Sequence, residues 1–211
     1  MNSTEKEIFY KTSNTYSALN TLTTETKNIW FVCHGMGYLS RYFIKHFKGL
    51  SEKENYIIAP QAQSKYYQSS NFKHVGSSWL TKENTSAETE NVMRYFDAIF
   101  ETENLPNKNK LVCLGYSQGV SVIMRYIARR KLNCDHLIIH SGGIPKELEV
   151  TDFSHFTGQV SLIYGTQDEY LTEERIAYET SRAKELFGDQ LNIIPFDGPH
   201  EVNETIIKSI V

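Results

Sequence analysis

The residues best suited to chemistry lie at 115–119, GYSQG, which has the pattern G-x-S-x-G. An apolar run at 111–114 precedes this pattern, and a long, largely apolar stretch at 120–130 follows it. A buried strand, a tight turn and a helix form the context that a nucleophile elbow requires. We therefore expect Ser117 to act as a nucleophile. The Gln118 N–H, at the start of the helix, is expected to face a developing oxyanion.

A serine hydroxyl attacks at neutral pH only with a base within hydrogen-bond reach. His200 is the one histidine that follows the elbow, comes just after an apolar run (191–196) and lies near the end of the chain. We therefore expect His200 to be the base. Of the other six histidines, His136 and His140 bracket a buried strand and are interpreted as structural, and His34 is interpreted as a residue that shapes its loop. The remaining three have no supporting pattern: His46, His74 and His155.

The base needs a third group to orient it, and the best candidate is Asp168. It lies in the segment 165–168, GTQD, which follows the apolar run at 160–164 and contains a glycine that favours a tight turn. Glu169 is its nearest rival. Asp197, close to His200, is a remoter one.

A second oxyanion donor should come from the loop after an earlier strand. Residues 34–37, HGMG, follow the apolar run 29–33, and glycines on both sides of Met36 let the backbone approach a bound carbonyl. The prediction is therefore that the backbone N–H of Met36 completes the oxyanion site.

Short apolar runs alternate with amphipathic stretches along the chain, which predicts a mostly parallel sheet with helices on both faces. The active groups of such a sheet gather beyond the carboxyl ends of its strands. We expect one domain over residues 1–211. The predicted strands cover 29–33, 56–59, 111–114, 136–140, 160–164 and 191–196, and the predicted helices cover 40–48, 85–102, 120–130, 172–187 and 201–210.

Four local expectations are more specific. Residues 8–10 and 16–19 could pair as a small hairpin. Residues 61–84 have no clear period and are expected to form the longest loop, and long loops in compact domains are often functional. A capping box at 85–88, TSAE, should open the helix that follows. Thr172 should cap the helix at 172–187, and Gly188 should end it.

Composition is that of an ordinary soluble protein, with 40% hydrophobic and 22% charged residues. The formal net charge of −3 gives no reason to expect nucleic acid as a partner. Neither a secretory signal nor an apolar run long enough for stable membrane insertion is visible, so we expect a cytoplasmic protein. Three cysteines, too few for a disulfide framework, are interpreted as buried thiols: Cys33, Cys113 and Cys134.

Together these motifs resemble those of the carboxylesterase and phospholipase family of small α/β-hydrolases, which includes the acyl-protein thioesterases. That family has an H-G-x-G loop, a G-F-S-Q-G elbow, a G-x-x-D segment and a late G-x-x-H, matched here at 34–37, 115–119, 165–168 and 198–200. Trp79 looks like the family's loop tryptophan, and 141–145, SGGIP, resembles its S-G-x-L-P turn. This chain departs from the pattern at 60–63, at Tyr38, Leu80, Tyr116 and Val120, and in the shorter spacing before His200.

The resemblance implies an α/β-hydrolase fold and a serine hydrolase that cleaves carboxylic esters or acyl thioesters without a metal or organic cofactor. Its substrate would be a small molecule, and the sequence leaves open whether the protein is a monomer or a homodimer. Two alternatives remain: a peptidase or acyltransferase on the same triad, and a non-catalytic ligand-binding protein with this fold. Candidate walls of an apolar acyl pocket are Met36, Tyr38, Leu39, Trp79 and Leu171.

Overall fold

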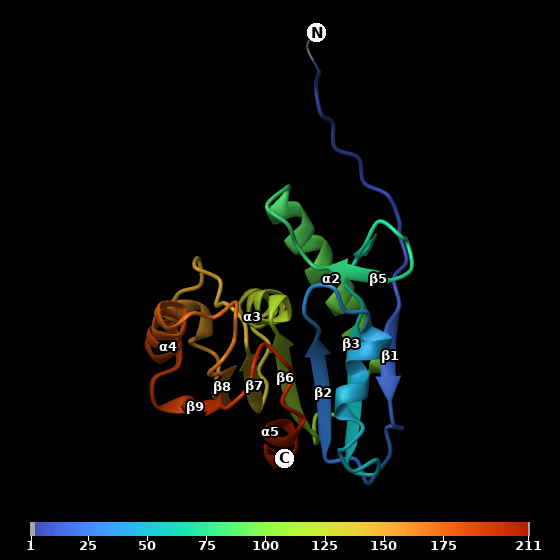
Figure 1. The fold of residues 1–211 in the computed structure, drawn as a ribbon. Helices are drawn as coiled ribbons and strands as arrows, with labels where there is room; N and C mark the ends of the chain where they lie inside the picture. The colour runs from blue at the N-terminus through green and yellow to red at the C-terminus, as the bar shows by residue number, and fades with distance from the viewer. Residues whose placement is uncertain (1–2, 211) are drawn as a thin grey trace.

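The computed structural model describes residues 3–210, and its centre is a seven-stranded sheet (Figure 1). The strand order is β1-β3-β2-β6-β7-β8-β9. All neighbouring strands are parallel except β1 and β3, which are antiparallel. The strands span Tyr16–Leu19 (β1), Asn28–Cys33 (β2), Asn55–Pro60 (β3), Lys110–Tyr116 (β6), His136–His140 (β7), Gln159–Gly165 (β8) and Leu191–Phe196 (β9).

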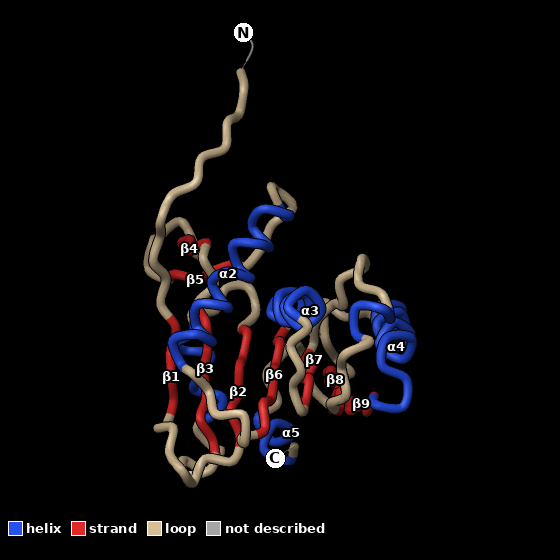
Figure 2. Tube along the Cα trace, turned by 180° about the vertical axis from the view of Figure 1, so that it is seen from behind, coloured by secondary structure: helices blue, strands red, loops and turns tan. Residues whose placement is uncertain are grey.

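Helices cover both faces of this sheet, as Figure 2 shows from behind. One face carries α2 (Thr85–Glu103), α3 (Gln118–Arg130) and α4 (Glu173–Phe187), and the other carries α1 (Ser40–Phe43) and α5 (Glu204–Ser209). Three short 3₁₀ helices are η1 (Ile44–Phe47), η2 (Val150–Phe153) and η3 (Gly188–Gln190). In residues 3–210 no helix combines the length and apolarity needed to cross a membrane.

Alternation of side chains along the buried strands builds two separate hydrophobic cores. In β2, Phe31 points into the core beneath α2 and α3, whereas its neighbour Trp30 packs into the core beneath α1 and α5. Both side chains are fully buried, which explains why the strand is apolar at consecutive positions. The three cysteines are buried and unpaired, as predicted, and burial raises the pKa of the Cys33 thiol.

The predicted strands and helices from residue 29 onward are present, with small changes at their ends. Thr172 caps α4 by accepting the Arg175 N–H, and the chain turns at Gly188 with φ +50°. The predicted helix at 40–48 changes to 3₁₀ geometry after Phe43. The last helix begins only at Glu204, because the Asn203 side chain accepts the Ile206 N–H and caps it there.

Two local predictions near helix and chain ends are wrong. Residues 8–10 form no strand; their side chains are about four-fifths exposed, and β1 pairs with β3 instead. The capping box at 85–88 is also absent. Asn84 occupies the cap position in the left-handed region without a side-chain bond, and the Thr85 hydroxyl donates to the Thr81 carbonyl instead.

The expected loop at 61–84 contains a two-stranded antiparallel hairpin, so it is less irregular than predicted. Its strands are β4 (Ser64–Tyr67) and β5 (Val75–Ser78). Every residue of β4 is exposed, so the strand lacks the buried positions that a sequence pattern could reveal. The hairpin rests on the loop after β2, where the Gly37 N–H donates to the Ser77 carbonyl at 2.9 Å.

Candidate active site

The turn between β6 and α3 holds Ser117 in a strained conformation. Its backbone has φ +52° and ψ −118°, a combination that costs of order 1–3 kcal/mol for a residue with a side chain. The Ser117 N–H donates to the His140 carbonyl at 2.9 Å, which ties the turn to the end of β7. At Gly119, a Cβ would lie 2.0 Å from the Cys33 carbonyl oxygen. Only glycine therefore lets α3 start so close to β2.

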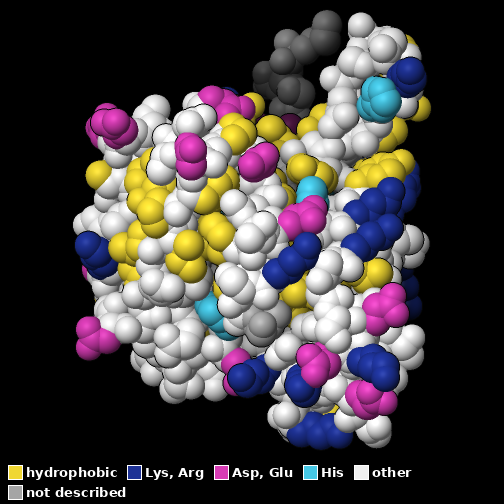
Figure 3. All heavy atoms as spheres, turned by 60° about the horizontal axis from the view of Figure 1, so that its bottom comes forward, with side chains coloured by type: hydrophobic (Ala, Val, Ile, Leu, Met, Phe, Trp, Pro, Cys, Tyr) yellow, Lys and Arg dark blue, Asp and Glu magenta, His cyan; other side chains and the backbone are white. Residues whose placement is uncertain are grey.

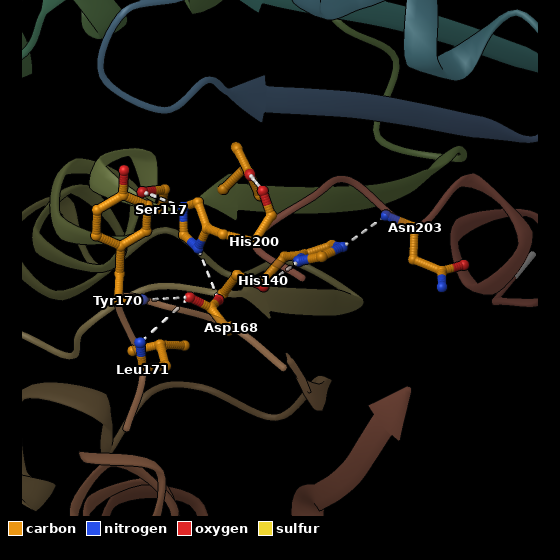
Figure 4. A network of polar contacts seen from close by, with 9 residues as sticks. Ser117, His140, Asp168, Tyr170, Leu171, His200 and Asn203 are labelled. Atoms are coloured by element: carbon orange, nitrogen blue, oxygen red, sulfur yellow. Dashed lines mark hydrogen bonds and ion pairs between the residues drawn. The ribbon is translucent and has the colours of Figure 1, made fainter. Parts of the chain in front are cut away.

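Three side chains from the ends of three strands meet at this turn (Figure 4). His200 Nε2 lies 3.0 Å from Ser117 Oγ, and His200 Nδ1 lies 2.6 Å from Asp168 Oδ2. Because a carboxylate only accepts, Nδ1 carries the proton and Nε2 is free to accept the serine proton. The structure thus brings together the three residues that the sequence singles out.

The Asp168 carboxylate is held on both oxygens. While Oδ2 faces His200, Oδ1 accepts the N–H groups of Tyr170 and Leu171 at 2.8 and 3.2 Å. The Asp168 side chain is fully buried, and that of His200 is 14% exposed. The two rival acids, Glu169 and Asp197, are exposed, and Asp197 accepts a hydrogen bond from the Gln167 side chain instead.

The loops that carry Asp168 and His200 touch because Gly165 has no side chain. A Cβ at Gly165 would lie 2.3 Å from the Gly198 carbonyl oxygen. The same approach lets the Gln167 N–H donate to the Gly198 carbonyl at 2.9 Å. The glycine that predicted a tight turn is therefore needed for close contact between two loops.

The loop after β2 lies directly against the serine. A Cβ at Gly35 would come within 3.1 Å of the Ser117 Cβ, so the next residue, Met36, borders the site. Within residues 3–210, the N–H groups of Met36 and Gln118 form no hydrogen bond. Two backbone donors are thus free beside the hydroxyl.

Buried polar contacts fix this loop. The Trp79 indole N–H donates to the His34 carbonyl at 2.7 Å, and the Gln118 side chain accepts the Trp79 backbone N–H at 2.8 Å. His34 Nδ1 faces the Gly35 carbonyl and its Nε2 accepts the Ala62 N–H, which is the neutral form of the ring. Burial lowers the pKa of His34 to about 4, so the ring stays neutral. His34 therefore shapes the loop, as predicted.

Two further residues support His200, and sequence reasoning did not assign them this role. The Tyr116 hydroxyl donates to the His200 carbonyl at 3.0 Å. His140 Nε2 accepts the Asn203 N–H at 3.0 Å, three residues beyond His200 (Figure 4). Burial, followed by the charge of His200, lowers the pKa of His140 to about 3. Both contacts join residues more than 60 positions apart, so no local pattern signals them.

A cavity of about 500 Å³ opens beside Met36. Two of the candidate pocket walls, Tyr38 and Leu39, line it. Trp79 and Leu171 do not line this cavity. Trp79 is 1% exposed and packs against His34 and Phe96, and the Leu171 N–H binds Asp168.

No protein-family model matches this sequence, and comparison with curated proteins finds no significant match. Comparison with solved structures does find relatives of similar length. They include acyl-protein thioesterase 2 from Zea mays, with 15% identity and a TM-score of 0.67 over 94% of this chain and 96% of that one. A phospholipase/carboxylesterase from Dyadobacter fermentans has 19% identity and a TM-score of 0.66 over 95% and 97%. A Bacillus cereus carboxylesterase has 12% identity and a TM-score of 0.66 over 93% and 91%.

These relatives confirm, as a likeness of structure, the resemblance to small α/β-hydrolases that the motifs suggest. The mostly parallel sheet, its two helical layers and the structural relatives together show that this chain has the α/β-hydrolase fold.

Proposed function

We propose that this protein is a serine hydrolase that cleaves carboxylic esters or thioesters through an acyl-enzyme intermediate. The observation that supports this most strongly is the hydrogen-bonded chain from Ser117 Oγ through His200 to the buried Asp168, at 3.0 and 2.6 Å. Strained backbone at the serine and free N–H groups beside it add to the argument, because acyl transfer needs both an exposed nucleophile and oxyanion donors.

In the first half of the reaction, Ser117 Oγ attacks the carbonyl carbon while its proton passes to His200 Nε2. The carbonyl oxygen becomes an oxyanion and accepts hydrogen bonds from the N–H groups of Met36 and Gln118. The carbonyl then re-forms and the bond to the alcohol or thiol breaks. The leaving group takes the proton from His200, and the acyl group stays on the serine.

Water completes the reaction by the same steps. It attacks the acyl carbon while His200 takes one of its protons, and the second oxyanion occupies the same pair of N–H groups. Collapse of this intermediate returns the proton from His200 to Ser117 Oγ and releases the carboxylic acid. Throughout, Asp168 holds the imidazole with Nε2 toward the serine and stabilises its charged form.

The first experiment compares the wild-type protein with Ser117→Ala on p-nitrophenyl esters of increasing acyl length. Loss of the nucleophile should lower kcat by about 10⁶-fold, to background. Ser121→Ala, one turn farther along α3, is the matched control and should keep full activity. Inert wild-type protein, or equal activity of wild type and Ser117→Ala, would overturn the proposal.

The same wild-type protein separates ester hydrolysis from the two other acyl chemistries. Amide substrates would reveal a peptidase, and an added alcohol acceptor would give a new ester if the acyl group is transferred. We expect free carboxylic acid as the main product, which liquid chromatography detects directly.

A further inference from the structure

The cavity beside Met36 begins at the residue that, under the proposed function, holds the oxyanion. One wall includes Tyr38, Leu39 and Tyr42, which lie in the segment after β2. The other wall comes from the β4–β5 hairpin and consists of Gln68, Lys73, His74 and Val75. The Gln68 side chain donates to the Gly37 carbonyl at 2.7 Å and joins the two walls. A group attached to a carbonyl at Ser117 can therefore extend into the cavity.

The two charged side chains on the cavity wall are both cationic. Arg41 and Lys73 line it together with His74, and no Asp or Glu does. The Arg41 guanidinium lies 5.0 Å from the centre of the Tyr42 ring. In residues 3–210, neither Arg41 nor Lys73 forms an ion pair with a carboxylate, so both charges are free to meet a ligand.

This bias extends over the two stretches of chain that build the cavity. Residues 28–51 and 55–82 together contain six Lys and Arg residues and no Asp or Glu, although the whole chain has a formal net charge of −3. Figure 3, which brings the bottom of Figure 1 forward, shows most of its Lys and Arg side chains in the right half of the view, where several acidic side chains also lie. A cleft with one sign of charge raises the local concentration of ligands of the opposite sign.

We propose that the cavity is an anion-binding subsite, and that the substrate is an ester carrying a second, negatively charged group such as a carboxylate or phosphate. This rests on the proposed function, because the cavity serves the reaction only if Met36, which lines it, holds the oxyanion. Arg41 and Lys73 bind the anionic group, and the aromatic rings of Tyr38 and Tyr42 cover the intervening carbon chain. The charged group can belong to the acyl part or to the alcohol part of the ester.

The test compares esters that differ only in this charge. For the acyl part, the pair is the mono-p-nitrophenyl ester of glutaric acid and the p-nitrophenyl ester of pentanoic acid. For the alcohol part, the pair is para-acetoxybenzoate and its methyl ester. The ratio of kcat/KM, anionic over neutral, is measured for each pair, and the pair with the higher ratio identifies the part that carries the charge.

We expect a ratio of about ten or more for one pair at low salt, falling toward one near 1 M salt, where the Debye length is about 3 Å. Arg41→Gln and Lys73→Gln should each lower the ratio about fivefold, and Lys73→Glu should lower it further. Lys53→Gln is the matched control, since Lys53 precedes the amino end of β3, opposite the site, and should leave the ratio unchanged.

Each outcome separates the two proposals. Turnover of neutral esters with ratios of one or less in both pairs overturns the anion subsite and leaves the hydrolase standing. A high ratio that neither salt nor the Arg41 and Lys73 variants change also overturns it. Absence of all turnover contradicts the hydrolase itself. Should a variant fail to fold, the salt dependence of the wild-type ratio decides.

Discussion

Replacement of Asp168 by Asn tests how the site sets the proton position on His200. The backbone N–H groups of Tyr170 and Leu171 can only donate, so the amide oxygen of Asn must take the place of Oδ1. The amide NH₂ then faces His200 Nδ1 and forces the ring proton onto Nε2. In that tautomer, Nε2 cannot accept the proton of Ser117.

The expected loss is therefore close to that of a triad with the wrong tautomer, about 10⁴ in kcat, or about 5 kcal/mol of transition-state stabilisation. Steady-state hydrolysis of a p-nitrophenyl ester measures it, and thermal unfolding checks that the variant is folded. Asp197→Asn and Glu169→Gln are matched controls, because both carboxylates are exposed and neither contacts His200 in the structure. An Asp168→Asn variant within tenfold of wild type, or a large loss in Asp197→Asn, would refute this assignment of the acid.

Two predictions concern stability. In the folded protein, His34 has a pKa of about 4 and His140 a pKa of about 3, whereas an ordinary histidine has a pKa of 6.5. Below pH 6.5 the unfolded chain therefore binds more protons than the folded protein, and the free energy of unfolding should fall as the pH falls. Each ring lowers the free energy of unfolding by up to about 1.4 kcal/mol per pH unit. Urea titrations between pH 7 and about pH 4.5 measure this dependence, and a free energy of unfolding that does not change with pH would contradict the prediction. Gly119→Ala should cost about 3 kcal/mol, because its Cβ would lie 2.0 Å from a strand carbonyl. Gly188→Ala, with no atom within 4 Å of the added Cβ, should cost only about 1 kcal/mol, and equal losses in the two variants would contradict the packing argument.

The parts of the fold that the sequence predicts correctly are those with a local signal. Strands such as β2 and β6 are apolar at nearly every position because both faces are covered, and a run of this kind is visible without knowing its neighbours. The residues Ser117, Asp168 and His200 could be selected because each follows an apolar run, at the end of a strand where a parallel sheet gathers its functional groups.

The parts that it missed depend on contacts between distant residues. The β4–β5 hairpin is held by bonds to the loop at 37–38, among them the Ser77 hydroxyl to the Tyr38 carbonyl at 2.7 Å. The sequence gives Tyr116 and His140 no role at the site, and the structure places them against the loop of His200, through bonds that span 84 and 63 positions. Trp79 was selected by resemblance for a pocket wall, and its indole instead braces the His34 carbonyl.

The order of the strands separates the three triad residues from the cavity along the chain. Ser117, Asp168 and His200 follow β6, β8 and β9, whereas every residue lining the cavity lies before α2, after β2 or β3. Mutations at the hairpin tip, residues 69–74, can therefore accumulate without touching the contacts by which Ala62, Gln68, Ser77 and Trp79 hold the loop after β2. Such a division makes a protein evolvable, and it marks residues 69–74 as the segment to exchange when a new selectivity is wanted on an unchanged reaction.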